Sequence, residues 1–228
     1  MADGYRETLK EKVVRATKET GVLPCIKLHE KIDNVLEYAQ AMYDGGARVV
    51  EVTMTTPGVL EYIEAIATHF EGRMYVAAGT VLDATTAREV ILHKGSLLVN
   101  PCVIPEVIEM GNRYGIPTYS GAFTATECFT AMKAGASMCK IFPGKLGGPA
   151  YMTNLKMVFP ELDLIPSGGI TLDNAGEFIK CGACAVSGAR TFMDMPKIES
   201  NGIGWITKQV SAFIEVISEA KKEPLLIP

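Results

Sequence analysis

A single lysine stands inside the apolar run "MCKIF", residues 138–142. A second run, "RVVEVT" at 48–53, holds one glutamate among valines in the same way. Burying an ionisable group without a partner is costly, so a charged residue in the middle of such a run usually marks a polar interior site. Lys140 and Glu51 are therefore the candidate catalytic pair, and a purely structural ion pair between them is the alternative.

The surroundings of Lys140 indicate what the pair could do. A lysine flanked by Ile141 and Phe142 is poorly solvated and loses its proton more readily than a free one. The neutral amine can attack a carbonyl carbon and form a Schiff base. Glu51 could then move the protons that carbon–carbon cleavage requires. Because the protonated imine would itself accept the electrons of the broken bond, we expect no metal and no organic cofactor.

Two glycine-rich segments could bind an anion. They are "IPSGGI" at 165–170 and "VSGAR" at 186–190. Glycine allows backbone N–H groups to converge on a phosphate, and barrels commonly bind phosphate after their seventh and eighth strands. A plain tight turn is the alternative for each segment. A third segment, "AAGTV" at 77–81, offers the Thr80 hydroxyl as a further donor.

These residues lie on or just after eight short β-rich runs that recur about every 20 to 26 residues, the size of a strand–helix unit. Eight consecutive units without a linker favour an α/β fold of the (β/α)₈ TIM-barrel type, with a doubly wound open sheet as the alternative. The runs are 22–26, 48–53, 74–78, 97–100, 116–120, 138–142, 162–167 and 183–188.

The rest of the chain completes one predicted domain over residues 1–228. An extra helix at about 3–20 would cover the bottom of the barrel, and the barrel itself would span about 21–221. An amphipathic last helix would begin at Gly204, before a short tail of unassigned role. Because side chains alternate along a barrel strand, Lys140 should point inward with Met138 and Phe142, and Glu51 with Val49 and Thr53.

Composition limits the classes of function. A net charge of −4 argues against a nucleic-acid partner. No apolar run reaches membrane-spanning length, and the charged first twenty residues lack the centre of a secretory signal. We therefore expect a cytoplasmic protein with reduced cysteines. The three histidines are scattered and "CGAC" has no second pair, so no metal site is predicted.

Six motifs resemble, in order and in strand position, those of the 2-keto-3-deoxy-6-phosphogluconate aldolases. The resemblance covers residues from about 20 to 190. It implies a class I aldolase, a homotrimer of (β/α)₈ barrels, that splits the phosphorylated keto acid into pyruvate and glyceraldehyde 3-phosphate. The motifs are "EVTMTTP", "AAGTVLD", "VNPCVIPE", "GAFTATE", "CKIFPGKLGGP" and "PSGGI".

Other substrates and one other class of function stay open. Many members of the family also accept 4-hydroxy-2-oxoglutarate, which lacks the phosphate. That acid and 2-keto-3-deoxy-6-phosphogalactonate are the alternative substrates for the same mechanism. A non-catalytic barrel that binds a phosphorylated ligand is an alternative of a different class.

The resemblance also implies roles for single residues. Lys140 would be the Schiff-base lysine and Glu51 the general acid and base. Thr80 would hold the pyruvyl carboxylate, with Pro101 and Phe142 as walls of the pocket. Further substrate-binding candidates are Thr53, Thr55 and Lys27. The candidates for the phosphate site are Ser167, Gly168, Gly169, Ser187, Gly188, Ala189 and Arg190.

Several positions depart from the family pattern. Thr55 stands where many members carry an arginine, whereas Lys27 keeps a cation where relatives often have arginine. Cys102 replaces a glycine. Ala189 replaces a serine that can bind phosphate through its backbone N–H, a group that alanine also has. Arg190 could strengthen that site or be a solvated surface charge. These changes leave open which 2-keto-4-hydroxy acid is preferred.

Overall fold

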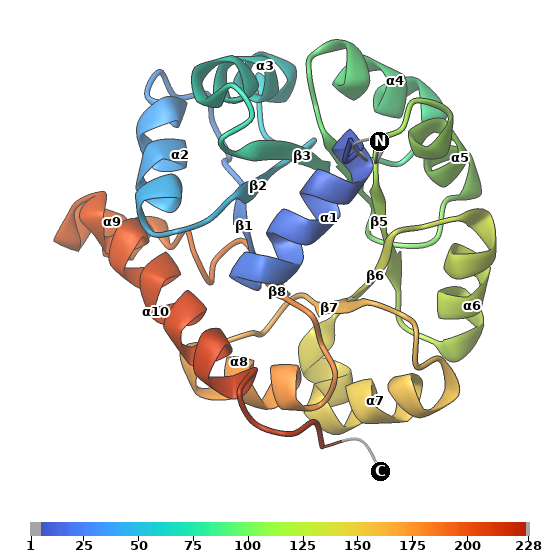
Figure 1. Cartoon of the computed structure of the whole chain (residues 1–228). Helices are drawn as coiled ribbons and strands as arrows, with labels where there is room; N and C mark the ends of the chain where they lie inside the picture. The colour runs from blue at the N-terminus through green and yellow to red at the C-terminus, as the bar shows by residue number, and fades with distance from the viewer. Residues whose placement is uncertain (1–5, 227–228) are drawn as a thin grey trace, which may run out of the picture.

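The computed structural model describes residues 6–226 of the chain. Its strands pair as parallel neighbours in the order β7-β6-β5-β4-β3-β2-β1-β8. Isolated bridges, Leu164 to Ala183 and Ser167 to Ser187, join the two ends of that order. The sheet therefore curls into a (β/α)₈ barrel, as predicted (Figure 1). The strands are β1 (Val22–Ile26), β2 (Val49–Thr53), β3 (Tyr75–Gly79), β4 (Leu97–Val99), β5 (Thr118–Ala122), β6 (Met138–Ile141), β7 (Leu164–Pro166) and β8 (Val186–Gly188).

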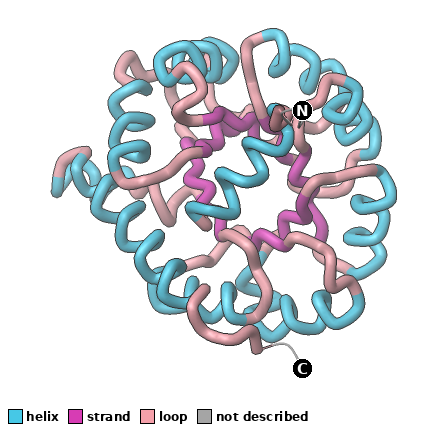
Figure 2. The backbone as a smooth tube through the Cα atoms, in the orientation of Figure 1, coloured by secondary structure: helices cyan, strands magenta, loops and turns pink. Residues whose placement is uncertain are grey.

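Apart from α1, the helices lie around the outside of the strands (Figure 2). The last of them starts at Gly204, as the sequence predicts, but a short helix, α9, precedes it without a predicted counterpart. The helices are α1 (Leu9–Thr20), α2 (Val35–Asp44), α3 (Val59–Phe70), α4 (Ala84–Leu92), α5 (Pro105–Arg113), α6 (Ala125–Ala134), α7 (Gly144–Val158), α8 (Leu172–Lys180), α9 (Met195–Asn201) and α10 (Gly204–Ala220). Within residues 6–226, no helix is long and apolar enough to cross a membrane.

Strand β1 has its predicted bounds, and the ends of the other strands differ from the predicted ones by up to three residues. Strand β5 is displaced by two residues from the predicted 116–120, because Ile116 and Pro117 lead into the strand and "GA" extends it. Strand β8 starts at Val186 and not at residue 183, where Ala183 makes only an isolated bridge. The inward or outward direction of the side chains was nevertheless predicted correctly for the residues that matter to the site.

Helix α1 starts later than the predicted residue 3. Residues 3–5 lie outside the described part, and the helix begins only at Leu9, because Thr8 and Glu11 form a capping box at its N-terminus. The helix lies across one end of the barrel (Figure 1). Its Thr17 hydroxyl shares a 2.7 Å hydrogen bond with the buried Tyr119 hydroxyl of β5. Lys18 pairs with Asp163, just before β7, so α1 closes the N-terminal ends of the strands as predicted.

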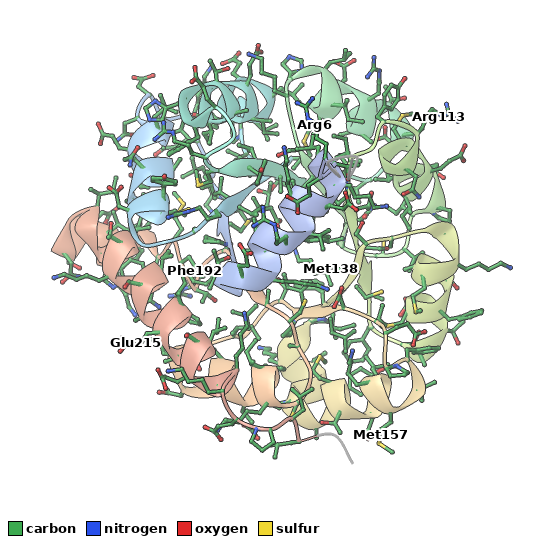
Figure 3. The ribbon with its side chains drawn as sticks, viewed as in Figure 1. Arg6, Arg113, Met138, Met157, Phe192 and Glu215 are labelled. Carbon is green, nitrogen blue, oxygen red and sulfur yellow. The ribbon has the colours of Figure 1, made fainter. Side chains whose placement is uncertain are left out.

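Apolar side chains divide into two packed groups. The larger group fills the space between the strands and the surrounding helices. The smaller group lies inside the barrel, and Figure 3 shows one of its members, Met138, near the barrel centre beside α1. Side chains that alternate along each strand account for this division. The inner group comprises Val13, Ala16, Leu23, Val49, Ala77, Leu97, Val99, Tyr119, Met138, Ile165 and Ala185.

Candidate active site

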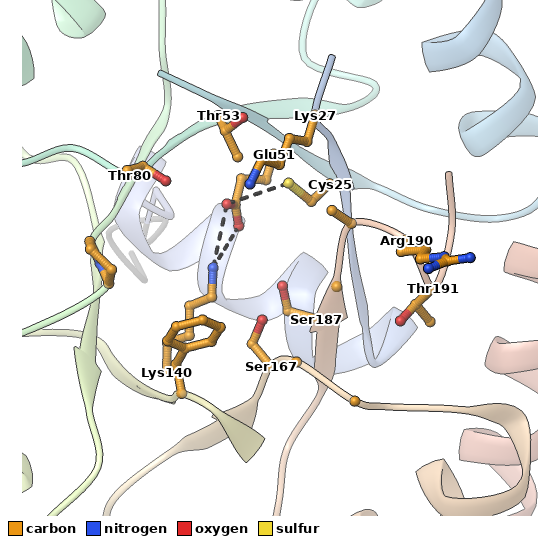
Figure 4. A pocket seen from close by; sticks show the side chains of 16 residues that line it. Cys25, Lys27, Glu51, Thr53, Thr80, Lys140, Ser167, Ser187, Arg190 and Thr191 are labelled. Atoms are coloured by element: carbon orange, nitrogen blue, oxygen red, sulfur yellow. Dashed lines mark hydrogen bonds and ion pairs between the residues drawn. The ribbon is translucent and has the colours of Figure 1, made fainter. Parts of the chain in front are cut away.

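Lys140 and Glu51 meet inside the barrel, although 89 residues separate them in the chain. The Lys140 Nζ lies 3.2 Å from Glu51 Oε2 and 3.4 Å from Oε1 (Figure 4). Only 12% of the lysine side chain and 2% of the glutamate side chain are exposed. Both residues follow the predicted alternation, with Met138 and Val49 of the inner apolar group directly below them. The pair thus sits where the apolar interior of the barrel ends.

Gly79, the last residue of β3, makes room for this pair. A Cβ built on Gly79 would lie only 2.0 Å from Glu51 Oε1 and 2.6 Å from its carboxyl carbon. Strand β3 is the neighbour of β2, and Thr53 is in register with Gly79. Any larger residue at position 79 would therefore push the carboxylate out of its place.

A cavity of about 310 Å³ opens above the ion pair. It lies at the C-terminal ends of the strands, the face on which barrel enzymes carry their active sites. The structure brings all but one of the predicted site residues to the wall of this cavity. Besides Lys140 and Glu51 these are Lys27, Thr53, Thr80, Pro101, Phe142, Ser167, Gly168, Gly169, Ser187, Gly188, Ala189 and Arg190.

Thr55 is the exception among the predicted site residues. It is exposed and lies outside the cavity wall, and its hydroxyl is 3.0 Å from that of Thr53, which does line the cavity. Its position two residues past the end of β2 takes it from the barrel interior into the following turn. Cys102 is likewise exposed and outside the wall, next to Pro101.

Thr80 has an unusual backbone conformation. Its φ angle is +60°, in the left-handed region that β-branched residues rarely adopt. Strain of this kind costs on the order of 1–3 kcal/mol and concentrates at functional sites. The turn after β3 therefore holds the Thr80 hydroxyl at the cavity against a local conformational preference.

The two glycine-rich segments face each other on the side of the cavity opposite Thr80 (Figure 4). Gly168 and Gly169 have φ angles of +85° and +81°, which only glycine adopts without strain. Within residues 6–226, the backbone N–H groups of Gly169, Ala189 and Arg190 donate no hydrogen bond to a protein acceptor, whereas Gly168 follows the bridge between Ser167 and Ser187. Three free donors from two neighbouring loops form an anion-binding arrangement.

Two further polar groups at the cavity have no tight partner. The Ser187 hydroxyl is buried and finds no hydrogen-bond partner in the described chain. The Arg190 side chain is 88% exposed, and its Nε lies 3.3 Å from Asp194 Oδ2. Because the arginine end of this ion pair is solvated, the pair contributes little, and the guanidinium can turn toward a bound anion.

The cavity wall also includes two residues that were not predicted, Cys25 and Thr191. Cys25 is in register with Glu51 on the neighbouring strand, and the alternation argument applied to "VLPCI" could have found it. Thr191 packs against Gly188, where a Cβ would lie 2.6 Å from its hydroxyl. No pattern in the sequence indicated Thr191, because it follows the strand in an irregular turn.

Comparisons with known proteins agree with the geometry. The family model described as KDPG and KHG aldolase matches residues 13–209. A 2-dehydro-3-deoxy-6-phosphogalactonate aldolase of Escherichia coli K12 is 33% identical over 201 residues, which cover 87% of this chain and 96% of that protein. A 2-dehydro-3-deoxy-phosphogluconate aldolase of Treponema pallidum is 32% identical over 168 residues, covering 73% and 79%.

Solved structures give the same result. A structure described as native KDPGal superposes with a TM-score of 0.83 at 28% identity, covering 89% of this chain and 96% of that one. A chain of a designed cube-shaped cage, made by fusing symmetric oligomeric domains, superposes with a TM-score of 0.82 at 28% identity, covering 89% and 73%. The alternative of a non-catalytic barrel is set aside, because the family model and both relatives are aldolases. The chain belongs to the KDPG and KHG aldolase family and is an aldolase, a carbon–carbon lyase.

Proposed function

We propose that the protein is a class I aldolase that cleaves 2-keto-3-deoxy-6-phosphogluconate to pyruvate and glyceraldehyde 3-phosphate. The observation that carries the proposal is the buried Lys140–Glu51 pair beneath a cavity whose rim holds free backbone N–H groups. The pair supplies a nucleophile next to a proton carrier, and the rim supplies an anion site. The proposed reaction uses no metal and no organic cofactor.

The proposed chemistry uses the two residues in turn. The Lys140 amine attacks the C2 carbonyl, and loss of water gives an iminium ion. Glu51 takes the proton of the C4 hydroxyl while the electrons of the C3–C4 bond move to the iminium, so that the aldehyde leaves and an enamine remains. Protonation of C3 and hydrolysis then release pyruvate and restore the free lysine.

The remaining cavity residues would position the two ends of the substrate. Thr80 and Lys27 would bind the carboxylate next to the keto group, with Pro101 and Phe142 as walls. At the other end, the loops after β7 and β8 would bind the phosphate through their free N–H groups and through Arg190. This arrangement favours a phosphorylated substrate over 4-hydroxy-2-oxoglutarate.

A second candidate substrate is the C4 epimer, 2-keto-3-deoxy-6-phosphogalactonate. The Escherichia coli relative, which this chain matches over nearly its whole length, is named for that substrate. Both epimers carry the same carboxylate, keto group and phosphate, so the groups described above would bind either one. The preference must lie in the contacts to the C4 hydroxyl.

A borohydride experiment tests the mechanism. Reduction in the presence of pyruvate should leave a covalent adduct on Lys140, identified by peptide mass mapping. Lys140→Ala should abolish the adduct, whereas Lys145→Ala, which alters an exposed lysine five residues away, should not. An unlabelled wild-type protein, or an adduct that survives Lys140→Ala, would overturn the proposal.

A substrate panel tests the specificity. Pyruvate release should be measured with the gluconate-derived acid, its galactonate-derived epimer and 4-hydroxy-2-oxoglutarate. We expect kcat/KM to be highest for a phosphorylated acid, and Gly168→Ala to lower it only for the phosphorylated substrates, because it adds a Cβ at a positive φ. Equal kcat/KM with and without phosphate would show that the loops after β7 and β8 bind no phosphate.

We also propose that the chain forms a homotrimer. Large apolar side chains of α6 and α7, namely Phe129, Met157 and Val158, are more than half exposed, and Phe129 stacks on Phe159 at 6.2 Å between ring centroids. The similar cage chain belongs to an assembly of symmetric oligomeric domains, which supports self-association. Light scattering coupled to size-exclusion chromatography should give three times the chain mass, and a monomer mass would contradict the proposal.

A further inference from the structure

Cys25 lies directly beside the proposed acid–base residue. Strands β1 and β2 place it in register with Glu51, and both side chains point into the barrel. The Cys25 Sγ is 3.6 Å from Glu51 Oε1, within reach of an S–H···O hydrogen bond (Figure 4). The cysteine is 4% exposed, so water does not compete for this contact. The backbone oxygen of Ile26 is a second acceptor at 3.8 Å, so the nearer acceptor of the thiol is this carboxylate oxygen.

The two oxygens of Glu51 have different surroundings. Oε1 accepts the thiol and lies against the backbone of Gly79, where a Cβ would come within 2.0 Å. The Lys140 Nζ donates to both oxygens, at 3.2 Å from Oε2 and 3.4 Å from Oε1. Oε1 therefore has the amine, the thiol of β1 and the backbone of β3 around it, while among the hydrogen bonds of residues 6–226 Oε2 has only the one from the amine.

The thiol keeps its proton in this environment. Burial, and then the charge of Glu51, raise the pKa of Cys25 well above its usual value. Lys140 and Lys27 are the cations that face it, and they act in the opposite direction. Cys25 is consequently a permanent donor at the pH values where an aldolase would act.

We propose that Cys25 is a positioning residue for Glu51: its S–H holds Oε1, and Oε2 is the oxygen that exchanges protons with the substrate. The inference rests on the proposed Schiff-base aldolase function. In the cleavage step the C4 hydroxyl proton moves to Oε2, and the C3–C4 electrons pass to the iminium. When the enamine is protonated, the same proton can return from Oε2 to C3. Oε1 keeps its bond to the thiol throughout.

Two measurements on the same variants test the assignment. Borohydride trapping with pyruvate reports Schiff-base formation at Lys140. Exchange of the pyruvate methyl hydrogens with deuterium from solvent reports the proton-transfer step. The variants are Cys25→Ala and Cys25→Val, which remove the donor, and Cys25→Ser, which keeps one. Cys139→Ala is the matched control, because Cys139 is an equally buried thiol beside Lys140 that faces the helices.

Removal of the donor should slow exchange by roughly fivefold without changing the extent of trapping or the KM for pyruvate. Cys25→Ser should restore the rate, because it keeps a donor at this position. Cys25→Val gives the same test if Cys25→Ala does not fold.

Each outcome has a distinct meaning. Slower exchange in the donor-free variants, rescue by serine and an unaffected Cys139→Ala would support the assignment. Wild-type exchange in Cys25→Ala or Cys25→Val, or equal losses in the serine and Cys139→Ala proteins, would overturn it while leaving the aldolase proposal intact. Failure of the wild-type protein to trap pyruvate would overturn both proposals.

Discussion

The lower and upper halves of the barrel interior are lined by residues that lie two positions apart along the same strands or directly beside them. Below are Leu23, Val49, Met138, Ile165 and Ala185, all fully buried. Above them, on the same inward faces, are Cys25, Glu51, Lys140, Ser167 and Ser187. The upper residues are nearly as buried as the lower ones. Burial alone therefore does not distinguish the core from the site. A step of two residues along each strand replaces an apolar side chain with one that carries a thiol, a hydroxyl or a charge.

The two halves also end differently. Helix α1 covers the lower end, where Val13 and Ala16 pack among the inner apolar residues. At the upper end the strands lead into loops that leave a cavity and keep several N–H groups free. Dense packing below stabilises the barrel, and unsatisfied polar groups above are available to a substrate. We expect substitutions in the two halves to separate stability from activity.

The largest effect should come from Lys140→Met in the upper half. It removes the proposed nucleophile, so pyruvate release should fall on the order of 10⁴-fold or more. It also leaves the Glu51 carboxylate buried without its partner, which should cost about 3–5 kcal/mol in the free energy of unfolding. Denaturant titration should show that adding Glu51→Gln recovers most of this stability but none of the activity. Residual activity within tenfold of the wild type would contradict the assignment.

Met138→Ala, one layer below, should have the opposite profile. Truncation of this fully buried side chain should lower the free energy of unfolding by about 2–5 kcal/mol. Because Met138 does not reach the cavity, kcat of the folded protein should stay within about twofold of the wild type. Leu92→Ala is the control on an exposed apolar side chain of α4 and should change neither quantity. A loss of kcat without a loss of stability would break the division between the halves.

Thr80→Gly, at the upper rim, should make the protein more stable and less active. Glycine adopts the φ of +60° without strain, so the free energy of unfolding should rise by up to about 1 kcal/mol. Loss of the hydroxyl should raise the KM for pyruvate. Glu71→Gly relieves a similar positive φ at the end of α3, far from the cavity, and should leave KM unchanged. If Thr80→Gly keeps the wild-type KM, the strained turn does not serve the carboxylate site.

The smallest expected effect concerns pH and the loop after β5. Backbone N–H groups of Thr124 and Phe123 donate to the Glu127 carboxylate and lower its pKa below the usual 4.5. A depressed folded-state pKa contributes stability above the unfolded value, and this contribution is lost as the pH falls through the folded one. Denaturation at pH 7 and pH 3 should therefore show a smaller pH dependence for Glu127→Gln. An unchanged pH dependence would mean that the hydrogen bonds to the Glu127 carboxylate do not stabilise the folded protein.

Most of the barrel could be predicted from local patterns. Regularly spaced β-rich runs indicated eight strands, and alternation correctly turned Lys140 and Glu51 inward. The bounds of β5, β7 and β8 were less well predicted, because a strand ends where its neighbour stops pairing with it. The start of α1 was missed by six residues, although the capping box formed by Thr8 and Glu11 is visible in the sequence.

The site was predicted in its composition more than in its contacts. The lysine and glutamate motifs predicted the Lys140–Glu51 pair, and the glycine-rich segments predicted the loops that could bind an anion. Thr55 was expected at the cavity but lies outside it, because the chain leaves the barrel interior after Thr53. Cys25 was overlooked because a cysteine in an apolar strand resembles an ordinary core residue, and only its pairing with Glu51 distinguishes it.

The sequence by itself determined the family, the strand count and the identity of the two ionisable residues, because these depend on residue types and on a period of two along a strand. Only the tertiary structure decided that Lys140 and Glu51 lie 3.2 Å apart, that Gly79 makes room for the carboxylate and that Cys25 contacts one of its oxygens. These contacts join different strands, with 26 positions between Cys25 and Glu51 and 89 between Glu51 and Lys140. Their geometry follows from the register of a closed barrel, which no single segment specifies.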